Sequence, residues 1–92
     1  MPTITPPTNA EERWLTCRIT KGMFSDERVV TYPAEGETQI SAFVPATAVE
    51  GNPGERGRVR VRVGRINGHL MAVLPTEYSD LVTVQEADVA PI

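Results

Sequence analysis

The chain has little of the chemistry that most catalytic and metal sites require. Its 92 residues include one cysteine and one histidine. The lone cysteine, Cys17, excludes an intramolecular disulfide and fits a reducing compartment. Metal binding needs several His, Cys or clustered carboxylate ligands at suitable spacing, and none is present, so we expect no metal and no cofactor. The combination of nucleophile, base and orienting group is missing as well, and we expect the protein not to be an enzyme.

Long apolar runs and a recognisable leader are also lacking. No apolar run approaches the roughly 20 residues of a membrane helix, and the opening stretch MPTITPPTNA has neither the basic nor the apolar region of a signal peptide. We therefore expect a cytoplasmic protein without membrane contact. His69 adjoins a turn and is expected to face solvent, and Cys17 is expected to be an inert inward thiol.

The apolar residues that are present favour strands. They make up 40% of the chain, and most are Val, with some Ile and Leu. Turn residues recur about every eight to twelve positions, and no helical pattern exceeds one turn. The sequence therefore predicts an all-β protein, a small antiparallel barrel of about five or six strands with one-turn 3₁₀ segments and no long helix.

The chain divides into one domain and two tails. Residues 1–10 are rich in Pro and Thr and are expected to be a mobile N-terminal tail. Residues 11–88 are expected to form the barrel, and residues 89–92 a C-terminal tail. Residues 75–80 are expected to form a single 3₁₀ turn before the last strand, which resembles the layout of SH3-like barrels. An OB-like barrel is the alternative, although it usually carries a longer helix between its third and fourth strands. The resemblance is one of layout, because no functional motif of a known family is matched.

The most patterned stretch is GRVRVRVGRING at residues 57–68. Residues 56–65 hold five Arg and no acid, a charge of +5, while the other residues hold four basic and twelve acidic side chains, a charge of −8; the sum is the net −3. If the valines at 59, 61 and 63 face the core, Arg58, Arg60 and Arg62 face outward about 6.7 Å apart. Such a row can bind an anionic partner, and more often it is a solvated or internally paired face.

The hairpin that follows this stretch has two possible registers. Asn67-Gly68 is the strongest turn signal in the chain, because a type I′ turn needs positive φ at both central residues. A two-residue turn pairs Gly64 with Met71 and Arg62 with Val73, which puts Met71 and Val73 on the arginine face. The same register puts Arg65 on the core face, a misfit that a bulge at Gly64 would relieve. The sequence leaves both registers open.

Apolar side chains on the outer face suggest a binding surface. Trp14, Phe43, Met71 and Val73 point outward on the alternation, and Trp, Phe, Met and Arg are enriched at protein interfaces. Alternatively, Trp14 folds over a barrel end, and Met71 and Val73 lie under a loop. We expect a non-catalytic binding module or accessory subunit that recognises a protein partner, or a second copy of itself. The residues expected to bind are Arg58, Arg60, Arg62, Met71, Val73, Trp14 and Phe43.

Single-stranded RNA binding is the alternative function. Small barrels bind nucleic acid with a basic groove and stacking aromatic residues, which the arginine row with Trp14 or Phe43 would supply. The pI near 5.0 and the small number of aromatic residues weigh against it. The sequence also repeats one short pattern, Phe24-Ser25-Asp26 and Tyr78-Ser79-Asp80. We interpret these as two similar turns, too short to indicate a duplication.

Overall fold

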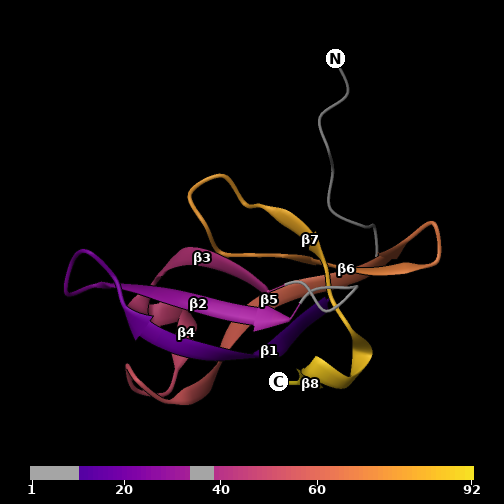
Figure 1. The fold of residues 1–92 in the computed structure, drawn as a ribbon. Coiled ribbons are helices and arrows are strands. Elements are labelled where there is room, and N and C mark those ends of the chain that lie inside the picture. Colours follow the sequence, from indigo (N-terminus) through magenta and orange to yellow (C-terminus); the bar gives the residue numbers. More distant parts are fainter. Residues whose placement is uncertain (1–10, 34–38) are drawn as a thin grey trace.

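In a computed structural model, the chain forms a single curled antiparallel sheet (Figure 1). The structure describes residues 11–33 and 39–92. The expected N-terminal tail, residues 1–10, and residues 34–38 lie outside the described residues. The all-β prediction is confirmed, and the sheet curls into a half-barrel. Its strands are β1 (Glu11–Lys21), β2 (Glu27–Pro33), β3 (Gln39–Pro45), β4 (Val49–Glu50), β5 (Arg56–Ile66), β6 (His69–Val73), β7 (Leu81–Thr83) and β8 (Val89–Pro91).

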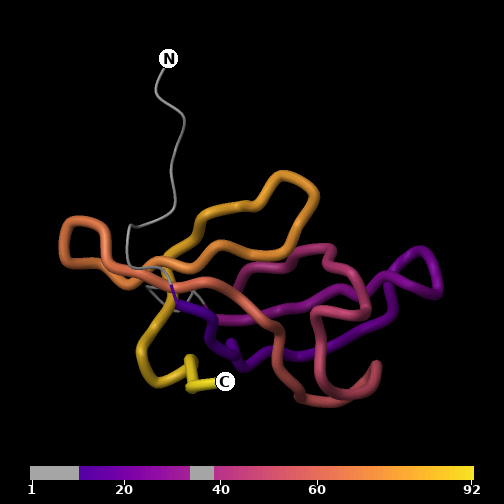
Figure 2. The backbone as a smooth tube through the Cα atoms, turned by 180° about the vertical axis from the view of Figure 1, so that it is seen from behind, coloured from indigo at the N-terminus to yellow at the C-terminus, as the bar shows by residue number. Residues whose placement is uncertain are grey.

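Two long strands, β1 and β5, form the centre of the sheet. The path runs β3-β2-β1-β5-β6-β7, which is six strands, and β4 and β8 are short additions off this path. β2 and β8 pair with β1, over residues 18–21 and 13–15, and β4 and β6 pair with β5, over 58–59 and 62–66. The view from behind shows β3 and the loop after β6 bordering the open side of the half-barrel (Figure 2).

The core lies on the concave face of this sheet and follows the period-two pattern of the sequence. Leu15 and Ile19 on β1 are fully buried, as are Val59 and Val61 on β5. Each such side chain contributes roughly 1.5–3 kcal/mol through removal from water. The remaining buried residues are Cys17, Val30, Tyr32, Val44, Val63, Ala72, Leu74 and Val84.

The β5–β6 hairpin adopts the plain two-residue register. Asn67 and Gly68 have φ angles of 51° and 81°, as a type I′ turn requires. Gly64 pairs with Met71 and Arg62 with Val73, so no bulge intervenes. The misfit at Arg65 is resolved differently, because this end of the hairpin extends beyond the core. The Arg65 side chain is exposed there and makes an ion pair with Glu86.

The structure changes two expectations about irregular segments. Residues 89–92 are not simply a tail, because β8 fills the edge of β1 that β2 leaves unpaired, and Val89 packs against the core. Residues 75–80 contain one i→i+3 turn, in which the Ser79 N–H donates to the Thr76 carbonyl over 3.0 Å, but the turn does not extend into a 3₁₀ segment. The Thr76 hydroxyl accepts a hydrogen bond from the Asp80 N–H, and Ser79 has a φ of 52°, which interrupts a helical turn.

The one-turn 3₁₀ segments lie elsewhere, at η2 (Ala46–Ala48) and η3 (Glu86–Asp88). An SH3-like layout is consistent with this arrangement, because η3 directly precedes the last strand. The OB-like alternative is expected to carry a longer helix between the third and fourth strands. Only η2 lies between β3 and β4.

Candidate functional site

The outer face of β1 and β5 gathers most of the predicted arginine surface. The register places Trp14 opposite Arg60 and Thr16 opposite Arg58. The guanidinium carbons of Arg58 and Arg60 lie 4.5 Å and 5.3 Å from the centroid of the Trp14 ring. Each contact is a cation–π interaction worth roughly 0.5–1 kcal/mol at an exposed site. Trp14 is therefore covered by its own arginines and does not fold over a barrel end.

Arg58 is held a second time, by an acid on β4. Its Nε and Nη2 atoms donate to Oε1 of Glu50 over 3.0 Å and 2.6 Å. The residue is half-buried, between Glu50 on one side and Trp14 on the other. The interpretation of the arginine row as an internally paired face thus holds for Arg58. Arg65 also makes an ion pair, with Glu86.

Four arginines on this surface stay available. Arg60 and Arg62 are exposed on β5, and Arg18 lies opposite Arg56 across the β1–β5 ladder. Among the residues that the structure describes, none of these four makes an ion pair. Arg18 and Arg56 are like charges directly opposite each other, a mildly unfavourable arrangement that an anion would relieve.

Apolar residues continue this surface onto β6 and β7. Arg62 pairs with Val73, which pairs with Leu81, and Gly64 pairs with Met71, which pairs with Thr83. Met71 and Val73 are half-buried. Six of the seven predicted binding residues thus lie on one continuous outer surface, which we call the arginine face: Trp14, Arg58, Arg60, Arg62, Met71 and Val73.

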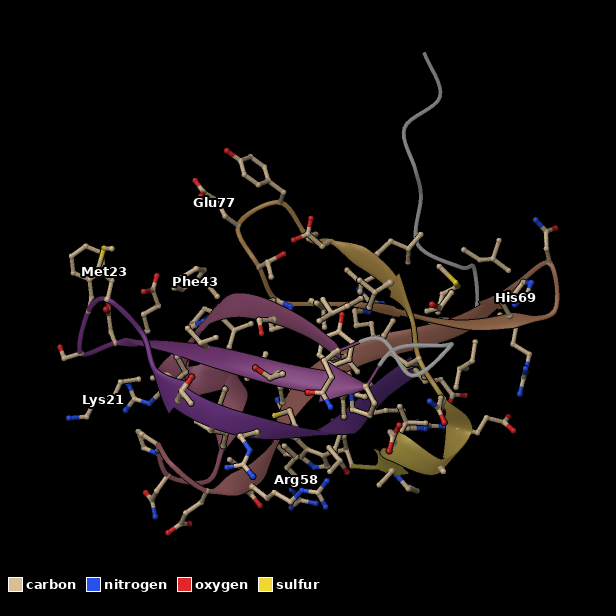
Figure 3. The ribbon with its side chains drawn as sticks, viewed as in Figure 1. Lys21, Met23, Phe43, Arg58, His69 and Glu77 are labelled. Atoms are coloured by element: carbon tan, nitrogen blue, oxygen red, sulfur yellow. The ribbon has the colours of Figure 1, made fainter. Side chains whose placement is uncertain are left out.

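Phe43, the seventh, lies apart from the arginine face. It is on β3, separated from β5 by β2 and β1. Figure 3 shows Arg58 on the lower side of the sheet and Phe43 with Glu77 on the upper side. Its side chain is 56% exposed and lines a cleft of about 710 Å³. That volume is within the range of about 300–1,000 Å³ for ligand sites.

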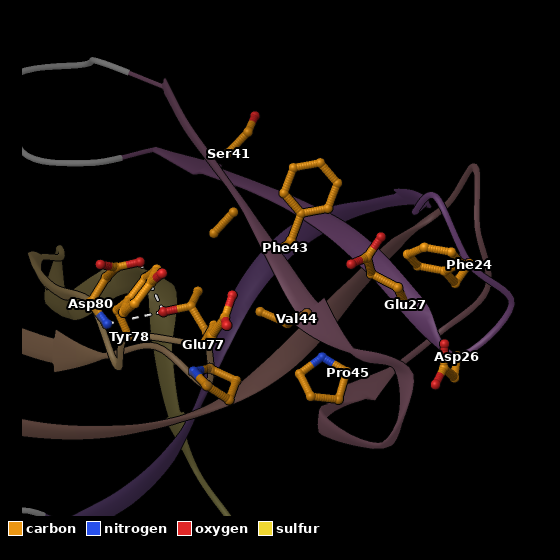
Figure 4. Close-up of a pocket in the computed structure, with 13 residues that line it drawn as sticks. Phe24, Asp26, Glu27, Ser41, Phe43, Val44, Pro45, Glu77, Tyr78 and Asp80 are labelled. Carbon is orange, nitrogen blue, oxygen red and sulfur yellow. Dashed lines mark hydrogen bonds between the residues drawn. The ribbon is translucent and has the colours of Figure 1, made fainter.

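The cleft brings together the two aromatic-Ser-Asp turns of the sequence. Phe24 and Asp26 come from the β1–β2 turn, and Tyr78 and Asp80 come from the β6–β7 loop (Figure 4). Phe24 and Tyr78 are 65% and 82% exposed. The repeated pattern was the available signal for this site, but nothing in one sequence indicates that the turns meet across β3.

Hydrogen bonds hold both turns in place. Oδ2 of Asp80 accepts a hydrogen bond of 2.8 Å from the Thr76 hydroxyl, and the Leu74 N–H donates to the Asp80 carbonyl. In the β1–β2 turn, the Met23 N–H donates to Oε1 of Glu27 over 2.7 Å, and Arg28 donates to the Ser25 carbonyl. The cleft walls are therefore braced by their own side chains.

Two titratable side chains, Cys17 and Tyr32, are buried in the core. Burial raises the pKa of the Cys17 thiol to about 11, which leaves it protonated and unreactive near neutral pH. Burial, and secondarily the negative charge of Asp80, raises the pKa of Tyr32 to about 12. The Tyr32 hydroxyl has no hydrogen-bond partner among the described residues.

Tyr32→Phe is expected to raise the free energy of unfolding by about 1 kcal/mol at pH 7, because it removes a buried hydroxyl without a partner. A second effect is expected in alkali. The folded-state pKa of Tyr32 lies above its ordinary value of 10.0. The ionisation of Tyr32 therefore leaves the wild type's free energy of unfolding unchanged below pH 10 and lowers it by about 1.4 kcal/mol per pH unit as the pH rises from 10 toward 12.

Urea unfolding of both proteins at pH 7, 10 and 11 measures these effects. The wild type is expected to lose stability faster than Tyr32→Phe between pH 10 and 11. The Cys17 thiol, whose pKa is raised to about 11, is present in both proteins, so its effect on stability cancels in the comparison. A Tyr32→Phe variant that is less stable at pH 7 would show that the hydroxyl has a bonding partner in solution.

Comparison of the chain with known proteins finds no relative. Known family models, curated proteins and solved structures were compared with the chain, and none matches it. Within residues 11–33 and 39–92, no three His, Cys, Asp or Glu side chains are grouped so that they could hold a metal ion. The same residues contain no helix with the length and apolar character needed to span a membrane.

Proposed function

We propose that the protein is a non-catalytic binding module that recognises an acidic protein surface through the arginine face. The observation that carries this proposal is the exposure of Arg60 and Arg62 without an ion pair among the described residues, next to half-buried Val73 and Met71. Arginine beside apolar side chains is the composition of interface centres. Guanidinium groups also bind carboxylates through two oxygens at once.

A protein partner is favoured over RNA because the most exposed aromatic rings lie away from the arginine face. Single-strand binding combines a basic groove with aromatic rings on which bases stack. The Trp14 ring is already in contact with Arg58 and Arg60. The exposed rings of Phe24, Phe43 and Tyr78 line a cleft with four carboxylates, which would repel a phosphate backbone.

Arg60→Ala/Arg62→Ala is expected to weaken binding of an acidic probe by about tenfold, or about 1.4 kcal/mol. The probe is an octapeptide of alternating Glu and Val, which is titrated into isotope-labelled protein at physiological salt. Binding is followed by the NMR chemical shifts of the backbone amides. Wild-type amide shifts are expected on the outer positions of β5, β6 and β7. Arg13→Ala/Arg65→Ala removes the same charge from residues that already have acidic partners, and it is expected to retain binding.

Mixed-sequence single-stranded RNA is titrated in parallel. RNA shifts on the arginine face at physiological salt, with no peptide shifts, would replace this proposal with nucleic-acid binding. No shift with either probe would leave the face as a solvated surface and contradict the proposal. Sedimentation that depends on concentration in the wild type but not in Arg62→Glu would identify the partner as a second copy.

A further inference from the structure

Within residues 11–33 and 39–92, the outer edge of β3 is an open strand edge. β3 ends the strand path, and among the described residues only β2 pairs with it. The Ala46 N–H donates to the Asp26 carbonyl over 2.7 Å, which sets the alternation of the β2–β3 ladder. By that alternation the N–H and C=O groups of Ser41 and Phe43 point away from β2. These groups can accept another strand.

The cleft described above lies along this edge. Its lining includes Ser41 and Phe43 from the outer face of β3 together with Ala42 and Val44 from the inner face. A cavity that touches both faces of one strand lies at the edge of that strand. The β6–β7 loop forms the opposite wall (Figure 4). An added strand would run between the two, with side chains reaching Phe24 at one end and Tyr78 at the other.

The negative charge of the cleft indicates which kind of peptide segment it can bind. Four carboxylates line it, from Asp26, Glu27, Glu77 and Asp80, and no Lys, Arg or His is among the described residues that line it. Exposed aromatic rings beside carboxylates bind the apolar stems and the charged ends of Lys and Arg side chains. The cleft therefore suits a cationic segment and disfavours an anionic one.

We propose that the cleft receives an extended basic segment of another protein, which pairs with the free edge of β3 as an added strand. This mode obtains affinity from backbone hydrogen bonds and specificity from alternate side chains. The segment does not come from a second folded copy. The basic stretch of this chain, residues 56–65, is internal to the sheet and paired by β1, β4 and β6. The cleft is separate from the arginine face, so the two proposals stand or fall independently.

The test is a titration of labelled protein with an acetylated, amidated octapeptide, Lys-Thr-Lys-Val-Lys-Thr-Lys-Val, at physiological salt. Amide shifts are expected at residues 24–27, 41–44 and 76–80, with the largest at Ser41 and Phe43. The same peptide with Glu in place of Lys is expected not to bind. The basic peptide N-methylated at its four central residues keeps its charge but loses strand pairing, and its affinity is expected to fall at least about tenfold.

Variants of the protein separate the cleft from general acidity. Phe43→Ala and Glu77→Lys are each expected to weaken the basic peptide by at least about fivefold. Met23→Ala removes a more exposed side chain outside the cleft, and Glu55→Lys makes the same charge change outside it. Both controls are expected to bind as the wild type does. All four positions are exposed, so the variants are expected to fold.

Three results would overturn the proposal. Equal binding of the N-methylated peptide would show attraction by charge without strand pairing. Equal binding of the acidic peptide, or no cleft shifts with the basic peptide, would show that the edge does not receive a cationic strand. Cleft shifts that grow with the concentration of the protein alone would identify a second copy as the occupant. Arg60→Ala/Arg62→Ala is expected to leave basic-peptide binding unchanged, whatever its effect on acidic partners.

Discussion

Leu15→Ala is expected to lower the free energy of unfolding by about 2 to 5 kcal/mol. Leu15 is fully buried and pairs with Val59 of β5 on one edge of β1 and with Val89 of β8 on the other. The cavity left by the smaller side chain therefore opens where three strands meet, and none of them can move inward without losing a ladder. Small domains have a total stability of about 5–15 kcal/mol, so the variant is expected to be close to unfolding at physiological temperature.

Urea unfolding followed by the fluorescence of Trp14, the single tryptophan, measures this loss. Ile92→Ala is the matched control, because it also truncates an aliphatic side chain but at a position that is 56% exposed. The control is expected to stay within about 0.5 kcal/mol of the wild type. A loss below about 1 kcal/mol for Leu15→Ala would show that the site collapses around the smaller residue, and would contradict the rigid junction of β1, β5 and β8.

Gly57→Ala is expected to destabilise the protein by about 1 to 3 kcal/mol, although it adds a single methyl group. A Cβ at this position would lie 2.4 Å from the Glu50 carbonyl oxygen and 2.3 Å from Cδ1 of Ile19. The Ile19 side chain can rotate away, but the carbonyl belongs to the backbone of β4. The expected fall in melting temperature is roughly 4–8 °C for each kcal/mol in a domain of this size.

Thermal unfolding of Gly57→Ala and Arg56→Ala tests this effect. Arg56 is the exposed neighbour on the same strand, so its truncation is expected to change stability little. Amide shifts at Val49 and Val59 give a second readout, because they report the β4–β5 pairing that the added methyl group would disturb. A melting temperature equal to that of the wild type would show that β4 shifts without cost.

The regular strands were predictable because local rules determine them. The valines at 59, 61 and 63 are buried as the alternation requires, and Asn67-Gly68 forms the expected turn with the expected register. The alternation also placed Phe43 outward. In each case neighbouring residues carry the information, and a strand or turn can be recognised without knowledge of the rest of the chain.

The parts that were missed depend on residues distant in sequence. β8 exists because β2 leaves the first half of one edge of β1 unpaired, which no local pattern in residues 89–91 reveals. Arg58 and Arg65 looked alike as members of a basic stretch, but their acidic partners, Glu50 and Glu86, are set by tertiary contacts. The acidic cleft was missed for the same reason, since its walls come from opposite halves of the chain.

The central position of β1 has a consequence for folding during synthesis. β1 precedes the other described strands, so it leaves the ribosome before all of its partners. Its second half pairs with β2, its main partner β5 ends at Ile66, and β8 ends at Pro91. The apolar face of Leu15 and Ile19 is therefore not fully covered until β8 has emerged. Pairings between distant segments form slowly and expose apolar surface to aggregation meanwhile. The central strand is therefore expected to be the first of these strands to be synthesised and the last to gain all its neighbours.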